Sequence, residues 1–209
     1  ITITSSVTNV TCFGLSNGSA TISATGGTGA YTYTWLPSGT ASPNILTNVA
    51  AGNYTVIVED AVANTNSLVV TIGEPSMLAA TTTVTNIACF GTATGIVNII
   101  ATGGIPPYQH SIAGGSYQSS SMFTNQPPGV QIISVKDGNN CTTTQTVVVT
   151  QAPQINIATT QTNVSCNGAC NGVLNISATG GNPPYFYFTG FGTTTPLNSN
   201  VCAGTYSVF

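Results

Sequence analysis

The sequence has very few charged residues. Its 209 residues include one Lys or Arg and four Asp or Glu, so that 2% of the chain is charged, whereas an average soluble domain has roughly 25%. The single cation, Lys136, cannot neutralise a phosphate backbone, which excludes nucleic acid as a partner. One His, one Lys and four carboxylates, spread over the chain, do not easily form an acid–base pair. We therefore expect no catalytic residue, no cofactor and no enzymatic activity.

A long apolar run is also missing. No segment approaches the ~20 consecutive apolar residues that a membrane-spanning helix needs, so we expect no insertion into a membrane. The polarity comes from Thr, Ser, Asn, Gln and Gly, which suit half-exposed strands and turns. Both ends of the chain are strand-like, which indicates a piece cut from a longer protein. The composition predicts an all-β protein whose neutral surface offers little repulsion between copies.

An internal repeat organises the chain. The motif Asn-x-x-Cys-x-Gly occurs three times, at residues 9–14, 86–91 and 163–168. The tetrapeptide Ala-Thr-Gly-Gly also occurs three times, at residues 24–27, 101–104 and 178–181. The repeat length is 77 residues, since 86 − 9 = 77 and 163 − 86 = 77. We expect three modules, the last ending before its final strand: residues 1–75, 76–153 and 154–209.

Each module is predicted to contain short strands separated by Gly, Pro and Asn. Apolar residues alternate with polar ones, as at Ala20, Ile22 and Ala24, which is typical of a sheet packed on one face. About seven such strands in each module predict an Ig-like antiparallel β-sandwich. Pro75 and Pro153 lie at short junctions that favour a semi-rigid string. The expected fold is all-β, with tandem Ig-like repeats of about 77 residues arranged as an extended rod.

These motifs resemble the SprB repeat, a module of giant surface adhesins of gliding Bacteroidetes. The resemblance covers essentially the whole chain, and its clearest copies are residues 137–141, 166–172, 180–185 and 202–206. It implies a non-enzymatic role in adhesion and gliding motility. It also implies export by the type IX secretion route and display on the bacterial cell surface. The first module departs from the pattern, because Asn64 stands where the second module has Cys141.

The six cysteines predict disulfides and hence an oxidising, extracellular compartment. The second module contains only Cys89 and Cys141, so we expect these two to be joined. The additional pair in the third module, Cys170 and Cys202, is expected to form a second disulfide. The two remaining cysteines are expected to be unpaired in this segment: Cys12, as a buried thiol, and Cys166, whose partner would follow Phe209.

A metal site is the alternative for the cysteines of the third module. Cys166 and Cys170 have a spacing that suits a metal, but a closed zinc site needs four N or S ligands. The single histidine, His110, lies in another module, where it replaces Tyr33 and is expected to pack in the core. We therefore expect no metal.

Asp60 and Asp137 occupy equivalent positions before turns. An aspartate at such a position is expected to cap the turn with its carboxylate. The alternative is a calcium site built from Glu59, Asp60 and neighbouring carbonyls.

Phe186 and Phe188 lie on a strand face that carries Thr, Gln or Ser in the other two modules, and Phe191 is close by. Because exposed apolar patches mark contact surfaces, these three residues form a candidate contact surface. The alternative is a loop that folds over the rings.

Three functions fit these features. The first is a segment of a repetitive cell-surface adhesin, an extended stalk and contact surface for attachment or gliding motility. Its partners would be neighbouring repeats or other copies of itself, and a surface polysaccharide or substratum. The second is a subunit of a polymeric extracellular filament, completed by strand donation between copies. The third is a carbohydrate-binding accessory module of a secreted protein, which the near absence of charge favours least.

Overall fold

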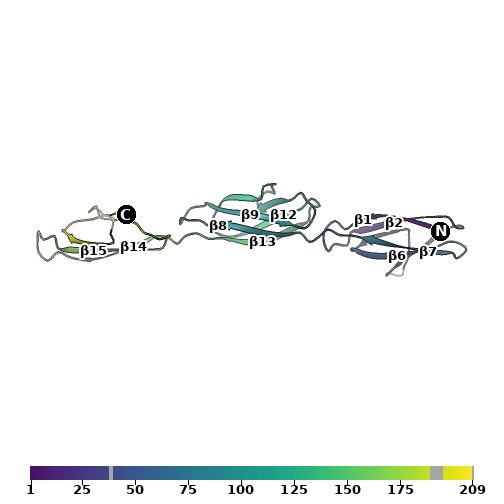
Figure 1. Cartoon of the computed structure of the whole chain (residues 1–209), viewed down its shortest axis with the longest axis horizontal. Coiled ribbons are helices and arrows are strands. Elements are labelled where there is room, and N and C mark those ends of the chain that lie inside the picture. Colours follow the sequence, from purple (N-terminus) through teal and green to yellow (C-terminus); the bar gives the residue numbers. More distant parts are fainter. Residues whose placement is uncertain (38–39, 189–194, 209) are drawn as a thin grey trace. The chain divides into compact units, whose positions relative to one another are not determined.

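The computed structural model describes the chain except residues 38–39, 189–194 and 209 (Figure 1). All elements of regular structure among the described residues are β-strands. No helix in this part of the chain is therefore long and apolar enough to cross a membrane. The described residues group into two compact units, and the division runs through the second repeat. The predicted boundaries of the three modules stay a prediction.

The first unit comprises Ile1–Thr82, Asn98–Ser121 and Ile132–Val147. It contains the whole first repeat, which is a sandwich of two antiparallel sheets. One sheet has the order β1-β2-β5, and its strands are β1 (Thr2–Thr8), β2 (Gly18–Thr25) and β5 (Ile45–Val49). The other has the order β4-β3-β6-β7, and its strands are β3 (Thr32–Leu36), β4 (Thr40–Ser42), β6 (Gly52–Glu59) and β7 (Thr65–Ile72).

The core of the first repeat follows from the alternation of its strands. Ala20 and Ile22 of β2 are buried together with Trp35 of β3, which is 0% exposed. Val56, Val58, Val70 and Ile72 complete this core from β6 and β7. The alternate residues of these strands face water, as a one-sided sheet requires. Gly18 opens β2 because a Cβ there would lie 2.6 Å from Ile72 Cγ2, which leaves room for no side chain.

The second repeat contributes to both units, and among its described residues the strands follow the pattern of the first repeat without a counterpart of β4. One of its sheets has the order β11-β9-β8, with β8 (Ala79–Thr85), β9 (Gly95–Thr102) and β11 (Met122–Gln126). The other has the order β10-β12-β13, with β10 (Gln109–Ile112), β12 (Gly129–Lys136) and β13 (Thr142–Val149). His110 on β10 is 6% exposed and lies opposite Val135, so the expectation of a packed histidine is confirmed.

The second unit comprises Thr83–Val97, Met122–Gln131 and Val148–Phe209. The third repeat lies within it as one sheet of order β14-β15-β16, with β14 (Asn156–Thr162), β15 (Gly172–Thr179) and β16 (Leu197–Val201). Leu174, Ile176 and Val201 form its core, against which Tyr187 and Tyr206 pack. The fold class is therefore confirmed: the chain is all-β and consists of Ig-like antiparallel β-sandwich repeats.

Candidate functional site: the cysteine loops

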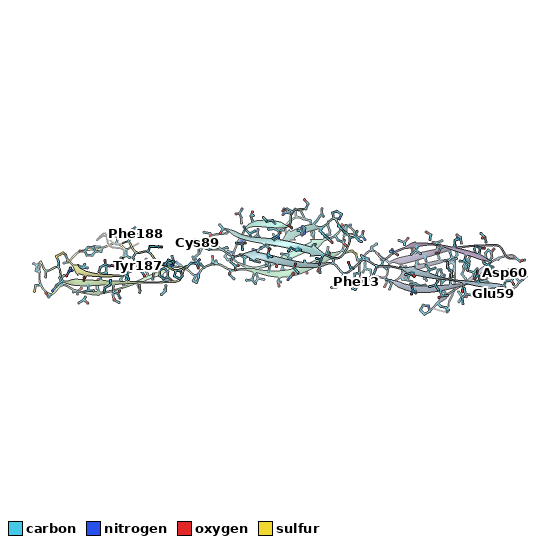
Figure 2. All side chains as sticks on the ribbon, in the orientation of Figure 1. Phe13, Glu59, Asp60, Cys89, Tyr187 and Phe188 are labelled. Carbon is cyan, nitrogen blue, oxygen red and sulfur yellow. A yellow bond between two sulfur atoms is a disulfide. The ribbon has the colours of Figure 1, made fainter. Side chains whose placement is uncertain are left out.

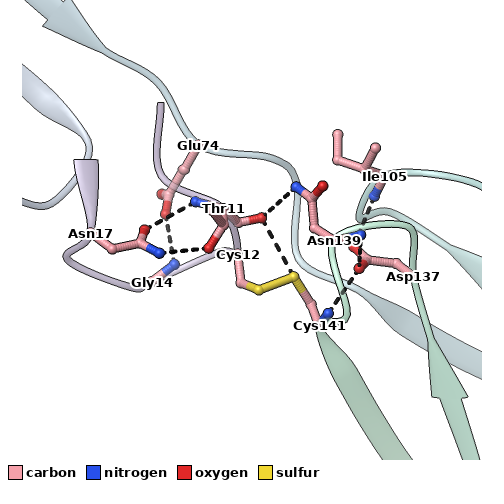
Figure 3. Close-up of a disulfide and its surroundings, with 9 residues drawn as sticks. All are labelled: Thr11, Cys12, Gly14, Asn17, Glu74, Ile105, Asp137, Asn139 and Cys141. Atoms are coloured by element: carbon pink, nitrogen blue, oxygen red, sulfur yellow. Dashed lines mark hydrogen bonds between the residues drawn. A yellow bond between two sulfur atoms is a disulfide. The ribbon is translucent and has the colours of Figure 1, made fainter. Parts of the chain in front are cut away.

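The loop that carries Cys12 follows Val10 and leads into β2 (Figure 3). The Thr11 N–H donates to Asn17 Oδ1 over 3.1 Å, and Asn17 Nδ2 donates back to Thr11 Oγ1 over 2.7 Å. Gly14 has a φ of +76°, and its N–H donates to Glu74 Oε2 over 2.6 Å. These bonds brace the loop within itself and against the segment that follows β7. The loop thus has a defined shape on which Cys12 is presented.

A second loop, from Asp137 to Cys141, follows β12. Both carboxylate oxygens of Asp137 accept backbone N–H groups, and the side chain is 3% exposed. Oδ1 accepts from Asn139 and from Cys141, each over 2.9 Å, and Oδ2 accepts from Ile105 over 2.9 Å. A Cβ at Gly104 would lie 2.6 Å from Asp137 Oδ2, so this close packing requires glycine. The carboxylate therefore fixes the loop against the Gly-Gly pair, Gly103-Gly104, of the repeated Ala-Thr-Gly-Gly motif.

A disulfide joins these two loops (Figure 3). It links Cys12 of the first repeat to Cys141 of the second, with the two Cα atoms 5.8 Å apart. Next to it, Asn139 Nδ2 donates to the Thr11 carbonyl oxygen over 2.8 Å, and Cys141 Sγ lies 3.5 Å from the same oxygen. The two repeats are therefore connected by a covalent bond besides the main chain.

The expected bond between Cys89 and Cys141 is wrong, and so is the expectation that Cys12 is a free, buried thiol. The first repeat shows the reason. Cys12 precedes Gly18 at the start of β2, whereas the Asp60 loop packs on Gly27, which follows the end of β2. An eight-residue strand spans about 23 Å, far more than the roughly 7 Å that a disulfide tolerates between Cα atoms. The two loops of one repeat lie at opposite ends of its strands and cannot be joined.

The third repeat contains the expected disulfide between Cys170 and Cys202. Cys89 and Cys166 are free and exposed. For Cys166 this agrees with the expectation of an unpaired residue. Cys89 was expected to be bonded, and nothing in the sequence indicates that its thiol is free. No cluster of three or more His, Cys, Asp or Glu side chains is found in the part of the chain that the structure describes.

Asp60 is the counterpart of Asp137 in the first repeat, and it caps its turn in the same way. Its Oδ1 accepts the N–H groups of Val62 and Asn64 over 3.1 and 2.9 Å. Its Oδ2 accepts the Thr28 N–H and the Asn64 side-chain amide, each over 3.0 Å. The prediction of turn-capping aspartates is confirmed. Four N–H donors occupy the carboxylate of Asp60, which leaves little of it for the calcium ion considered as the alternative.

Asn64 gives the Asp60 loop a feature that the Asp137 loop lacks. The bond from its side-chain amide is the largest cause of a pKa for Asp60 of about 2, below the ordinary value of 3.8. Backbone N–H bonds lower this pKa further, and burial partly opposes them. Cys141, at the equivalent position, instead uses its side chain for the disulfide. The same loop thus ends in an internal hydrogen bond in one repeat and in a bond to the preceding repeat in the other.

The candidate contact surface lies in the third repeat (Figure 2). Phe186 is 78% exposed and Phe188 is 64% exposed, while Tyr187 between them packs on the core. Phe186 also lines a shallow cavity of about 300 Å³ together with Ile155 and Ile157. Phe191 lies outside the described residues. The expected strand is wrong, since residues 185–188 have no regular structure, but the exposure of both rings agrees with the expected outward orientation. The function of these residues as a contact surface remains a proposal.

Comparison with known proteins adds the family. The model of the SprB repeat matches the chain three times, at residues 4–40, 81–116 and 158–188, and the matches start 77 residues apart (81 − 4 and 158 − 81). The chain belongs to the SprB-repeat family. No curated protein matches it. Each SprB match includes the Cys-bearing loop described above, at residues 9–14 or its equivalents.

A solved structure is also similar to this chain. It is the C-terminal 282-residue fragment of intimin in complex with the intimin-binding domain of the translocated intimin receptor, Tir. The sequence identity is 18%, the TM-score is 0.38, and the match covers 71% of this chain and 66% of that chain. This chain therefore spans slightly less than two thirds of the intimin fragment. A similarity at this level carries no argument about function.

Proposed function

We propose that this chain is a non-enzymatic segment of a repetitive adhesin on the bacterial cell surface, where its repeats form a stalk that carries tension during attachment or gliding. The observation that carries the proposal is the disulfide between Cys12 and Cys141, which joins consecutive SprB repeats. Disulfides persist in oxidising, extracellular surroundings, which agrees with surface display. A bond between repeats contributes nothing to a catalytic site, but it does contribute to a stalk.

The path of the chain through the first repeat supports this role. Strand β1 begins with Thr2 opposite Thr25 and ends with Thr8 opposite Ser19. Strand β7 ends at Ile72, whose side chain lies against Gly18. The chain therefore enters the repeat at one end of β2 and leaves it at the other, so that a pull on the chain acts along the strands.

The disulfide limits how far such a stalk can be stretched. Its two cysteines are separated by 129 residues. A force applied to the two chain ends is transmitted through the S–S bond, so the residues between Cys12 and Cys141 carry no load. At about 3.5 Å for each extended residue, the disulfide shortens the contour length of the unfolded chain by about 450 Å, even if both repeats unfold. An adhesin built in this way would keep its reach nearly constant under load.

Single-molecule stretching of the 209-residue chain between its two ends tests this mechanical role. We expect the fully unfolded, oxidised chain to be about 450 Å shorter than the chain with Cys12→Ala and Cys141→Ala, since the loop is then released. Cys89→Ala is the matched control and should leave the contour length unchanged. Equal lengths for the oxidised chain and the double variant would contradict the proposal.

Surface display needs a separate test. Antibodies raised against this chain should label intact cells of the source organism. Brief treatment of those cells with an added protease should remove the label. Labelling only after the cells are permeabilised would contradict the proposed localisation, whatever the stretching experiment gives.

The exposed rings of Phe186 and Phe188 are the proposed contact surface of the stalk, with other copies of the chain or a surface polysaccharide as partner. The variant with Phe186→Ser and Phe188→Ser should bind less to cells or to itself, with its melting temperature unchanged. Val130→Ser is a matched control, because Val130 is 70% exposed in another repeat. Unchanged binding of the double variant would refute this contact surface.

A second candidate, the subunit of a filament completed by strand donation, is favoured by one feature. A groove of about 290 Å³ in the third repeat is lined by Gly172, Leu174 and Tyr206. In the first repeat, β7 packs on the equivalent glycine, Gly18. A strand donated by another copy would fit this groove. Light scattering of the chain with Phe186→Ser and Phe188→Ser under reducing conditions separates the candidates, because a filament subunit still polymerises by strand donation and a stalk segment stays monomeric.

A further inference from the structure

Cys89 and Cys166 occupy the position of Cys12 in the second and third repeats, since each is 77 residues from the previous one. Cys12 is bonded, whereas Cys89 and Cys166 are exposed free thiols. One of the bonds that brace the loop around Cys12 has a counterpart in the loop around Cys89. The Gly91 N–H donates to Gln151 Oε1 over 3.0 Å, in the same way as the Gly14 N–H donates to Glu74. The second repeat thus presents Cys89 on a loop that in the first repeat forms a disulfide.

An open groove lies beside Cys89. Its volume is about 580 Å³, and its lining includes Cys89, Phe90, Gln154, Ile155, Gly181 and Asn182. Gly181 is the repeat equivalent of Gly104, over which the Asp137 carboxylate lies. Among the described residues, a Cβ at Gly181 would meet only the side chain of Ile155 within 4 Å. No described residue therefore occupies the position beside Gly181 that the Asp137 carboxylate occupies beside Gly104.

The hydrogen-bonding groups around the two cysteines also correspond. The Thr11 carbonyl oxygen, just before Cys12, accepts from Asn139 Nδ2 over 2.8 Å. The Ala88 carbonyl oxygen, just before Cys89, accepts from Asn182 Nδ2 over 3.0 Å. A carbonyl oxygen has two lone pairs, so the Ala88 oxygen retains one for a second donor. The groove thus contains three groups that a loop like the Asp137 loop would contact: the thiol of Cys89, the carbonyl oxygen of Ala88 and the backbone of Gly181.

We propose that Cys89 and Cys166 are each the site of a disulfide to the cysteine of an Asp-x-x-x-Cys loop in the following repeat of the same chain. In the repeat register, the loop that would reach Cys89 follows Phe209. Two thiols lose two electrons and two protons as the S–S bond forms, and the disulfide of a thiol–disulfide oxidoreductase takes them up as a dithiol. Consecutive bonds of this kind would link every repeat to the next, except where Asn64 replaces the cysteine.

The inference rests on the repeat geometry and not on the adhesive role, so either can fail without the other. The test extends the full chain by the missing loop. Gly204-Thr205-Tyr206 corresponds to Gly129-Val130-Gln131, so Phe209 corresponds to Ser134. We would therefore join a copy of residues 135–153 directly after Phe209, which adds an Asp-x-x-x-Cys loop in register.

Alkylation of the oxidised, extended chain followed by non-reducing peptide mapping gives the readout. We expect a peptide that contains Cys89 linked to the added cysteine. The number of alkylated thiols should fall from two, Cys89 and Cys166, to one, Cys166. The matched control carries Asn in place of the added cysteine, as the first repeat does at Asn64, and should again show two alkylated thiols.

Two results would overturn the proposal. One is full alkylation of Cys89 in a chain that has formed the Cys12–Cys141 and Cys170–Cys202 bonds. The other is a bond from the added cysteine to Cys166 or to another chain, the latter seen as a dimer on a non-reducing gel. Because the added segment can fail to pack, the protein purified from its source should be mapped as well. There, Cys89 linked to an Asp-x-x-x-Cys peptide supports the proposal, and alkylated Cys89 overturns it.

Discussion

The loops around Cys12 and Cys89 have the same motif, yet one is closed by a disulfide and the other is open. Both are braced by a glycine N–H that bonds to the segment after the last strand of the repeat. They differ in what lies beside them: the Asp137 loop of the next repeat covers the first, and a groove adjoins the second. A bonded cysteine thus coincides with an Asp-x-x-x-Cys loop beside it, and a free cysteine with an open groove.

The Asp60 and Asp137 loops make a second, complementary comparison. Each aspartate accepts two backbone N–H groups of its own loop and one from the residue that follows the Gly-Gly pair, Thr28 or Ile105. The residues that follow the aspartate differ: Ala61-Val62-Ala63-Asn64 in one loop and Gly138-Asn139-Asn140-Cys141 in the other. The aspartate cap is therefore independent of the disulfide, whereas Asn139 and Cys141 make the contacts to the preceding repeat.

The largest effect is expected from removing the disulfide between the repeats. Cys12→Ala with Cys141→Ala should lower the free energy of unfolding of the first two repeats by about 4–5 kcal/mol, the chain-entropy value for a loop of this length. Denaturant titration measures the loss, with Cys89→Ala as the control that leaves the midpoint in place. If the double variant unfolds at the same denaturant concentration as the oxidised chain, the disulfide does not stabilise the repeats.

A smaller loss is expected from Asp137→Ala, which leaves three backbone N–H groups without their acceptor. The cost should be about 2–3 kcal/mol, and the Cys12–Cys141 bond should be reduced at lower dithiothreitol concentration because its loop is no longer held. Asp60→Ala removes the same kind of cap from a loop without cysteine. It should leave the dithiothreitol concentration that reduces the disulfide unchanged. An equal effect of the two variants would mean that the Asp137 cap does not hold Cys141 in place.

The pH dependence of the first repeat should reflect the pKa of Asp60. This pKa is about 2 in the folded chain, below the ordinary 3.8, so the ionised carboxylate stabilises the fold. The stabilisation is complete above about pH 4 and is lost as the pH falls towards 2. NMR titration of the Asp60 carboxyl measures the pKa directly. Asn64→Ala removes the largest cause of the low value and should raise this pKa, and an unchanged value would contradict the account of the loop.

The smallest effect is expected from Glu74→Gln. The second repeat already has Gln151 at this position, where it accepts the Gly91 N–H as Glu74 accepts the Gly14 N–H. The free energy of unfolding should change by less than about 0.5 kcal/mol, as for most surface substitutions. A thermal melt measures it. A loss well above 1 kcal/mol would indicate that the two loops are braced differently.

Much of the fold could be predicted from the sequence because periodicity reports burial. Alternation places Ala20, Ile22 and Ala24 on the inner face; Ala20 and Ile22 are at most 1% exposed, and Ala24 is partly buried. The capping role of Asp60 and Asp137 followed from their place before turns. The exposure of Phe186 follows from comparing equivalent positions in the three repeats, although the strand expected there does not form.

The pairing of the cysteines could not be predicted in the same way. Assigning partners within repeats leaves Cys12 and Cys166 unpaired, and assigning them between repeats leaves Cys89 and Cys166 unpaired, so counting favours neither. The decisive fact is that the two loops of one repeat lie at opposite ends of its strands. That fact depends on the direction of each strand in the sandwich, which alternation of apolar residues does not report.

Peptide mapping of the oxidised chain without reduction shows directly whether Cys12 is bonded to Cys141. Since Lys136 is the only Lys or Arg in the chain, digestion with chymotrypsin or pepsin is the practical route. The account predicts linked peptides for Cys12 with Cys141 and for Cys170 with Cys202, with Cys89 and Cys166 alkylated. A peptide linking Cys89 to Cys141 would mean that each disulfide stays within its repeat, and it would contradict the account.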